Sequence, residues 1–277
     1  MRCRRIVLFV SLHFRVHMRV PTRIGMIMTL TSTAFDLHPS SGTEHWYRIT
    51  DSRYRFHVAT PTSDPNLWDR YLAGAEECYE KFGVGDALGS VELRDGGDTS
   101  LFFAAIDPDH PDAPAAGVRV QGPYTDVDQS HATVEWSGLP GEAELRKMIC
   151  DRLPFGVLEM KGAWIAPDAH EKFRLSSAIA RAALPALAIL DAQFVMATTA
   201  EYLLPQWTSS GGVVAKSIPS APYPSEEYRT VIGFLDRTSF ASHADPQQIP
   251  MMLNEVMELT RTIEWHHDRR HLRAVGR

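Results

Sequence analysis

One segment, residues 155–212, constrains the fold of this chain more than any other. It reads as a β-strand at residues 155–165, an apolar helix at about residues 173–190, and a second strand at residues 193–199. A strand–helix–strand unit predicts a parallel pair of strands with a right-handed crossover, and ligands bind at the carboxyl ends of such strands. We therefore expect an α/β fold with its site at this edge of the sheet.

A carboxylate, Glu159, lies in the middle of the first of these strands among apolar and aromatic residues. Burying a carboxylate costs free energy unless the group is paired or used in chemistry. Two interpretations follow. Glu159 takes part in a reaction, or it forms a structural ion pair with a neighbouring Arg or Lys.

Composition excludes several function classes. The 277-residue chain carries a net charge of −6, whereas a general nucleic-acid binder needs clustered Lys and Arg to neutralise phosphates. Its apolar runs all fall short of the ~20 residues of a membrane span. The three cysteines lie far apart without a paired spacing, which is typical of a reducing compartment. We expect a cytoplasmic protein that does not bind nucleic acid and does not span a membrane.

The chain divides into three parts by composition. Residues 1–50 are predicted to be a poorly structured leader, and the first 27 of them are basic. These 27 residues are a flexible extension, or they precede a working initiator at Met26 or Met28, or they have a targeting or membrane-surface role. Residues 51–240 are predicted to form one domain. Residues 241–277 are predicted to form a C-terminal helix, because apolar residues recur along one of its faces.

Within the central part, apolar periodicity predicts further elements. A helix over residues 64–82 has a carboxylate at its start and proline in its first turn. A second helix precedes the strand that carries Glu159 and contains Leu145. Strands are predicted at residues 54–59, 101–106, 117–121, 131–136, 213–218 and 228–234, the second and third of them forming a hairpin.

This order of elements, over about residues 54–236, resembles the GCN5-related N-acyltransferase (GNAT) superfamily. The closer likeness is to acyl-homoserine-lactone synthases and long-chain N-acyl amino acid synthases. Three stretches carry it, at residues 158–165, 200–212 and 218–228. The resemblance implies a mixed central sheet flanked by helices, here with an extra C-terminal helix.

The chain departs from the family pattern at three places. Residues 170–177 lack the glycines of the loop that binds the donor pyrophosphate. Trp207 stands where many acetyltransferases have a tyrosine that protonates the leaving thiolate. Gly162 replaces the arginine of the Glu-x-x-Arg motif, so recognition as in homoserine-lactone synthesis is not expected.

The resemblance implies transfer of an acyl group from a thioester to a primary amine of a small molecule, such as an amino acid. The thioester is carried by coenzyme A or by an acyl carrier protein. A helix N-terminus binds anions, so the donor phosphates are expected at the start of the predicted helix at residues 173–190, beside Lys172, Arg174, Ser176 and Ser177.

The same comparison assigns roles around the reacting groups. Glu159 is the expected general base, and backbone amides near Trp164 and Ile165 are expected to polarise the thioester carbonyl. Aromatic and polar side chains either line the site or pack in the core: Tyr202, Gln206 and Trp207 at the mouth, and Phe102, Phe103, Trp136 and Trp164 around an acyl chain.

Two further alternatives stay open. The departures also fit a catalytically silent protein that binds an acyl thioester or a partner protein. His267 and His271 lie four residues apart, a spacing that suits a metal pair, but the neighbouring sequence offers no third ligand. We expect a cationic cluster at a helix end there and no metal site.

Overall fold

A computed structural model describes residues 45–88 and 91–275. Its strands are β1 (His45–Arg48), β2 (Arg55–Ala59), β3 (Leu101–Asp107), β4 (His110–Gln121), β5 (Val157–Ile165), β6 (Phe194–Ala200), β7 (Val213–Val214) and β8 (Thr230–Asp236). They form one eight-stranded sheet in the order β1-β2-β3-β4-β5-β6-β8-β7. Only β5 and β6 pair in parallel within this described sheet, as the sequence predicted.

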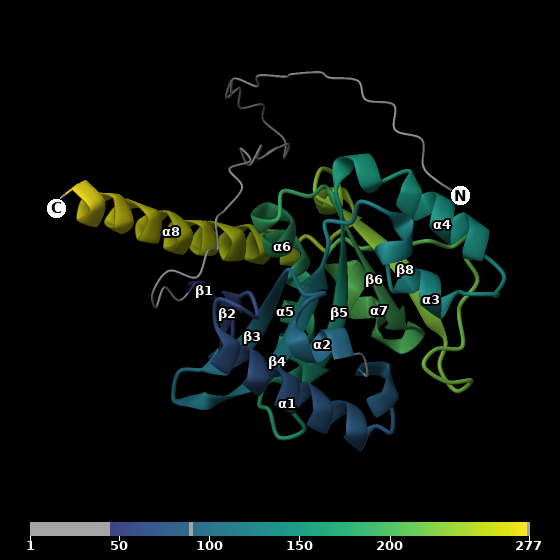
Figure 1. Ribbon diagram of the computed structural model, residues 1–277, viewed down its shortest axis with the longest axis horizontal. Coiled ribbons are helices and arrows are strands. Elements are labelled where there is room, and N and C mark those ends of the chain that lie inside the picture. Colours follow the sequence, from purple (N-terminus) through teal and green to yellow (C-terminus); the bar gives the residue numbers. More distant parts are fainter. Residues whose placement is uncertain (1–44, 89–90, 276–277) are drawn as a thin grey trace.

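Helices cover both faces of the sheet (Figure 1). They are α1 (Pro65–Lys81), α2 (Val91–Asp95), α3 (Ala132–Glu135), α4 (Glu142–Cys150), α5 (Lys172–Arg181), α6 (Ala183–Ile189), α7 (Leu204–Ser209) and α8 (Gln248–Val275). The core clusters place α5, α6 and α8 on one face, α1 on the β2–β4 part of the other, and α3 and α4 on its β5–β8 part. The far end of α8 projects beyond the sheet (Figure 1).

The crossover helices bury the first face. Leu158 and Val195 of the parallel pair are fully buried with Leu184 and Leu187 of α6. Fully burying one such side chain stabilises the fold by about 1.5–3 kcal/mol. This packing fixes the position of the β5–β6 pair relative to α5 and α6.

A buried ion pair ties α8 to this face. Arg181 at the end of α5 lies 2.8 Å from a carboxylate oxygen of Glu255 in α8, and both side chains are almost completely buried. The same carboxylate accepts a hydrogen bond from the amide of Thr50, at 3.0 Å. The C-terminal helix α8 is thereby joined to α5 and to the segment between β1 and β2.

On the opposite face, α1 packs by the apolar stripe predicted from the sequence. Asp64 caps the helix, since its side chain accepts a hydrogen bond from the amide of Leu67 at 2.9 Å, and Pro65 occupies the first turn. Tyr71 on the buried side contacts the rings of Phe102 and Trp164. The predicted helix over residues 64–82 is confirmed.

Two predicted elements differ in the structure. The strand predicted for residues 131–136 is wrong, because Ala132–Glu135 is the helix α3; its amino end is held by contacts from β5 that the local sequence does not show. The single helix predicted for residues 173–190 is instead two, α5 and α6, which meet at Ala182. Pro185 has no amide hydrogen to donate to the carbonyl of Arg181, so the helix is interrupted there.

Other boundaries also change. The prediction of little structure up to residue 50 is wrong at its end, because β1 pairs with β2 in the sheet. The strand predicted for residues 213–218 shortens to Val213–Val214, and residues 204–209 form α7. The predicted hairpin and the strands at 54–59 and 228–234 are confirmed as β3–β4, β2 and β8 within a few residues. The predicted basic extension, residues 1–27, lies outside the described residues.

Candidate active site

The two parallel strands separate halfway along their length. They pair from Val157 with Phe194 up to Met160 with Ala197. Beyond this point β5 continues beside β4, and β6 continues beside β8. The sheet is therefore split between β5 and β6 at their carboxyl ends, the position at which open α/β sheets bind ligands.

Helix α1 lies along the β5 side of the split. The Tyr71 hydroxyl donates to the carbonyl of Gly162 at 2.6 Å, and the Tyr79 hydroxyl donates to the carbonyl of Ala163 at 3.2 Å. Gly162 has φ +57°, and a Cβ added there would lie 3.0 Å from the Tyr71 hydroxyl. An arginine would be strained and crowded here, which explains the glycine at this position of the motif.

The register assigns different directions to the amides of Trp164 and Ile165. The amide of Ala166 donates to the carbonyl of Ala115 at 2.8 Å, and Ile165 is paired with Ala116. Bonded and non-bonded pairs alternate in an antiparallel ladder, so the Ile165 amide faces away from β4, toward the split, while that of Trp164 faces β4. Of these two predicted donors, Ile165 has the suitable direction.

A charged cluster bridges the split on the face that carries α3. One carboxylate oxygen of Glu135, Oε1, lies 2.6 Å from the Lys161 ammonium and 3.0 Å from Nδ1 of His131. The same oxygen accepts a hydrogen bond from the Thr198 hydroxyl at 3.0 Å. Lys161 follows the last paired residue of β5, and Thr198 follows that of β6. Glu135 thus joins the two strands where they diverge.

The cluster keeps its charges because its members support one another. Burial favours the neutral acid, but Lys161 and His131 hold the pKa of Glu135 below its usual value. Burial likewise favours the neutral amine, yet the carboxylates of Glu135 and Glu159 raise the pKa of Lys161. At neutral pH the site therefore contains an ionised pair with an imidazole beside it.

Glu159 lies behind this cluster and is completely buried. Its carboxylate accepts hydrogen bonds from the Tyr124 hydroxyl at 2.8 Å and from the Ser130 hydroxyl at 3.1 Å. It also accepts the backbone amides of His131 at 3.0 Å and Ala132 at 3.2 Å. Glu159 therefore caps the amino end of α3 from a neighbouring strand and fixes the backbone of His131.

A polar band continues from Glu159 across the sheet, between α1 and α3. Gln121 on β4 lies 3.2 Å from the Tyr124 hydroxyl and donates to Asp98 at 2.6 Å. Asp98 in turn pairs with Arg119 at 2.9 Å. Burial and the nearby Glu159 carboxylate raise the pKa of Tyr124, so its hydroxyl remains a donor.

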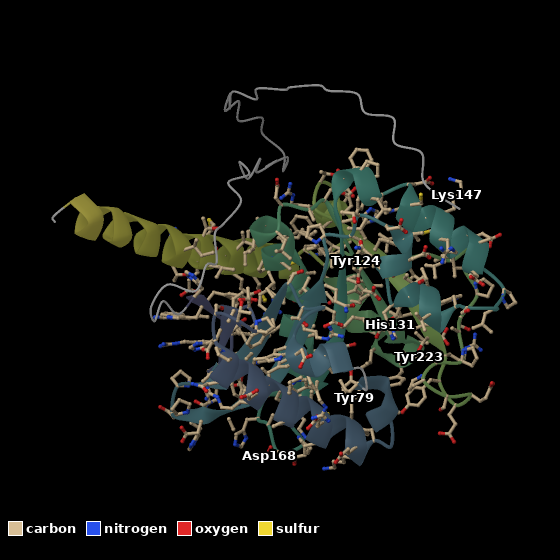
Figure 2. The ribbon with its side chains drawn as sticks, viewed as in Figure 1. Tyr79, Tyr124, His131, Lys147, Asp168 and Tyr223 are labelled. Atoms are coloured by element: carbon tan, nitrogen blue, oxygen red, sulfur yellow. The ribbon has the colours of Figure 1, made fainter. Side chains whose placement is uncertain are left out.

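Two tyrosines, Tyr223 and Tyr79, lie near the cluster (Figure 2). The ring of Tyr223 packs edge-on against the imidazole of His131, with 5.8 Å between centroids. Burial raises the pKa of Tyr79 to about 12, although Lys161 acts in the opposite direction. Burial also raises the pKa of Tyr223, so both hydroxyls stay protonated at neutral pH and bring no charge to the cluster.

The predicted donor-binding residues lie at the start of α5. Glu171 precedes the helix with φ +56°, and its side chain does not cap the first turn. Lys172 donates to the carbonyl of Pro167, and Arg174 donates to that of Asp51. Ser177 is buried and Ser176 half-buried. Phosphates at this helix end would meet two cationic side chains beside backbone amides.

The remaining predicted side chains are dispersed. Tyr202 is 71% exposed and lies at the end of β6, in a cavity of about 460 Å³ that it shares with Glu201, Glu227, Tyr228 and Arg229. Gln206 is half-buried, and Trp207 is buried against Gly212 and Gly233.

Phe102 and Trp136 are fully buried in separate clusters, so they do not form one wall of an acyl pocket; Phe103 faces the opposite side of the sheet.

Sequence reasoning missed His131, Glu135 and Lys161. His131 and Glu135 are four residues apart, a spacing that places both on one face of a helix. This shared face was not recognised because residues 131–136 were predicted to form a strand. Lys161 was visible two residues after Glu159, which puts both side chains on one face of β5.

Comparison with known proteins places the chain in a family. No known family profile matches the sequence. Rv1356c, an uncharacterised protein of Mycobacterium tuberculosis, is 45% identical over 228 residues, which cover 82% of this chain and 85% of Rv1356c. The chain belongs to the Rv1356c family. Mb1391c of Mycobacterium bovis, also uncharacterised, matches with the same identity and coverage.

The Rv1356c-family chain is also similar to solved structures. FeeM, an N-acyl amino acid synthase from uncultured soil microbes, aligns with a TM-score of 0.48 at 12% identity, over 71% of this chain and 97% of FeeM. BjaI, a CoA-dependent acyl-homoserine lactone synthase, aligns with a TM-score of 0.45 at 13% identity, over 79% and 98%. The predicted architecture, a mixed sheet flanked by helices with an additional C-terminal helix, is confirmed.

Within residues 45–88 and 91–275, no helix has the length and apolar character needed to cross a bilayer. No group of three or more His, Cys, Asp and Glu side chains in the same ranges is arranged to hold a metal ion.

Proposed function

We propose that the protein transfers an acyl group from a thioester to a primary amine at the split between β5 and β6. One observation carries this proposal: the strands diverge beside a partly exposed imidazole, His131, that is oriented by a buried carboxylate, Glu135. Acyl transfer requires a base that is oriented by a second group, here a carboxylate, and free backbone N–H groups next to it that polarise the carbonyl.

The reaction assigns a role to each group. The amine nitrogen attacks the thioester carbonyl carbon, the carbon–nitrogen bond forms, and the carbon–sulfur bond breaks. Nδ1 of His131 lies 3.0 Å from both the Glu135 carboxylate and the Lys161 ammonium, and the reaction uses the tautomer in which Nδ1 donates to Glu135. In that tautomer Nε2 accepts the proton that the amine loses and returns it to the leaving thiolate. The side chain of His131 is 36% exposed, so Nε2 has access to a bound amine. The amide of Ile165 polarises the carbonyl oxygen.

Glu159 has a positioning role in this proposal. Its carboxylate is completely buried and is already bonded to four donors, two of them backbone amides of the turn that carries His131. A substrate amine cannot reach it without displacing one of these donors. The proposal therefore moves the general base from Glu159 to His131, and Glu159 acts through the backbone that it holds.

The donor phosphates are placed at the amino end of α5. Replacing Lys172 and Arg174 together by Ala should weaken coenzyme A binding by about 10-fold or more, because two charge-assisted contacts are lost. Calorimetric titration measures the affinity. The matched control replaces Arg48 and Lys147, two exposed cations elsewhere on the surface, and should bind coenzyme A normally. Equal affinity of both double variants would place the donor elsewhere.

Turnover separates an enzyme from a silent binding protein. The protein is titrated with acetyl- and long-chain acyl-coenzyme A and with the corresponding acyl carrier protein thioesters. A set of primary amines is then added. Transfer releases a free thiol and forms an amide of the expected mass in equal amounts. Binding without thiol release for every donor and amine would support the silent alternative and contradict the proposed activity.

A further inference from the structure

The two carboxylate oxygens of Glu135 are used unequally. Oε1 has three partners, namely Lys161, His131 and Thr198. Oε2 is buried and has no hydrogen-bond partner among the described residues. The whole side chain is inaccessible to solvent at 0% exposure. A buried, unpaired carboxylate oxygen costs free energy, so such an atom marks a position where a ligand donor is stabilised.

The charges around Glu135 point to the sign of that ligand. The charged side chains linked through this polar band carry one more negative than positive charge when His131 is neutral; they are Glu135, Glu159, Asp98, Lys161 and Arg119. In a site of low dielectric, an unbalanced negative charge favours a cation and opposes a second anion.

The surface cavity that contains Tyr202 has the same character. The cavity at the end of β6 is lined by two carboxylates, Glu201 and Glu227, two tyrosines and one arginine. The arginine, Arg229, is already paired with Glu201 at 3.1 Å. Aromatic rings with an excess of carboxylates attract ammonium groups, so this cavity favours the same kind of ligand as the cluster around Glu135.

We infer that the acceptor is a cationic primary amine with no carboxylate on the carbon that bears the nitrogen, and that it docks with an N–H on Oε2 of Glu135. This inference rests on the proposed transfer to an amine and narrows its substrate class. It disfavours α-amino acids, because their carboxylate would add a second unbalanced negative charge beside Glu135 and Glu159. The docked ammonium lies next to His131 and first loses one proton to solvent through this imidazole; after attack, the second proton passes through His131 to the leaving thiolate.

Butylamine and norvaline test the inference as a matched pair. Norvaline is butylamine with a carboxylate added on the carbon next to nitrogen. Ligand-observed NMR on the full chain measures both dissociation constants, and butylamine should bind at least 10-fold more tightly. Glu135→Gln should weaken butylamine binding about 10-fold or more and reduce the difference between the two ligands. Glu144→Gln, an exposed carboxylate of α4, should change neither value.

Each outcome supports or overturns the inference. Norvaline binding as tightly as butylamine would overturn it, as would unchanged butylamine affinity in Glu135→Gln. If that variant does not fold, the comparison of the two ligands on the wild-type protein still decides. Acyl transfer to norvaline but not to butylamine would refute the inference and leave the proposed activity intact. Absence of transfer to any amine, with butylamine still preferred in binding, would refute the activity alone.

Discussion

Replacing His131 by Asn should lower turnover by about 100-fold or more and leave donor affinity unchanged. The Asn side-chain amide nitrogen occupies nearly the position of Nδ1, so it can still donate to Glu135. The substitution removes Nε2, the atom that accepts the proton, and a positioned base contributes 10²–10⁴-fold to rate. Steady-state kinetics and donor titration measure the two quantities separately.

The matched control for this variant is His110→Asn. His110 is an exposed residue at the start of β4, away from the split, and its replacement should leave turnover unchanged. Turnover of His131→Asn within about 3-fold of the wild type would exclude His131 as the base. A parallel loss of donor affinity would indicate that the site itself had been distorted.

Replacing Glu159 by Leu should lower the free energy of unfolding by about 2 kcal/mol or more. Leucine leaves the amide of His131 and two hydroxyl groups without their acceptor, while the amide of Ala132 keeps only the Ser130 hydroxyl oxygen, at 3.2 Å; each buried unsatisfied group costs about 1–3 kcal/mol. Tyr124 and Ser130 can rotate to other partners, but the amide of His131 cannot. Chemical denaturation measures the difference.

Glu159→Gln distinguishes the positioning role from a role as the base. Glutamine has only one acceptor oxygen, so in either orientation its NH2 group faces a backbone N–H and both groups are donors. We therefore expect about 1–3 kcal/mol of destabilisation together with reduced turnover. A base that merely lost its proton acceptor would give full stability with turnover reduced about 100-fold or more. That result would return the catalytic role to Glu159. Glu144→Gln serves as the stability control.

The sequence predicts the elements whose pattern is local. The spacing of apolar residues is sufficient to predict α1, and the strand–helix–strand order is sufficient to predict the parallel pair of β5 and β6. The helix α3 could not be predicted in this way, because Glu159 on a distant strand satisfies its first amides. The edge strand β1 was missed because its pairing with β2 outweighs the polar composition around it.

The site was only partly predictable for the same reason. The position of Glu159 on the buried face of β5 follows from the sequence, but its partners come from residues 124–132. The cluster at the split combines side chains from α3, β5 and β6, at Glu135, Lys161 and Thr198. Contacts between elements so far apart in the chain are not encoded in any local period.

Hydrogen–deuterium exchange with a non-reactive thioether analogue of acyl-coenzyme A tests the central claim most directly. The account places the thioester at the split, with its phosphates at the start of α5. Amide exchange should therefore slow in residues 161–166 and in the first turn of α5, around residues 172–175. Protection confined to another part of the chain, such as the separate cavity lined by Arg55, Asp64 and Arg70, would contradict the account.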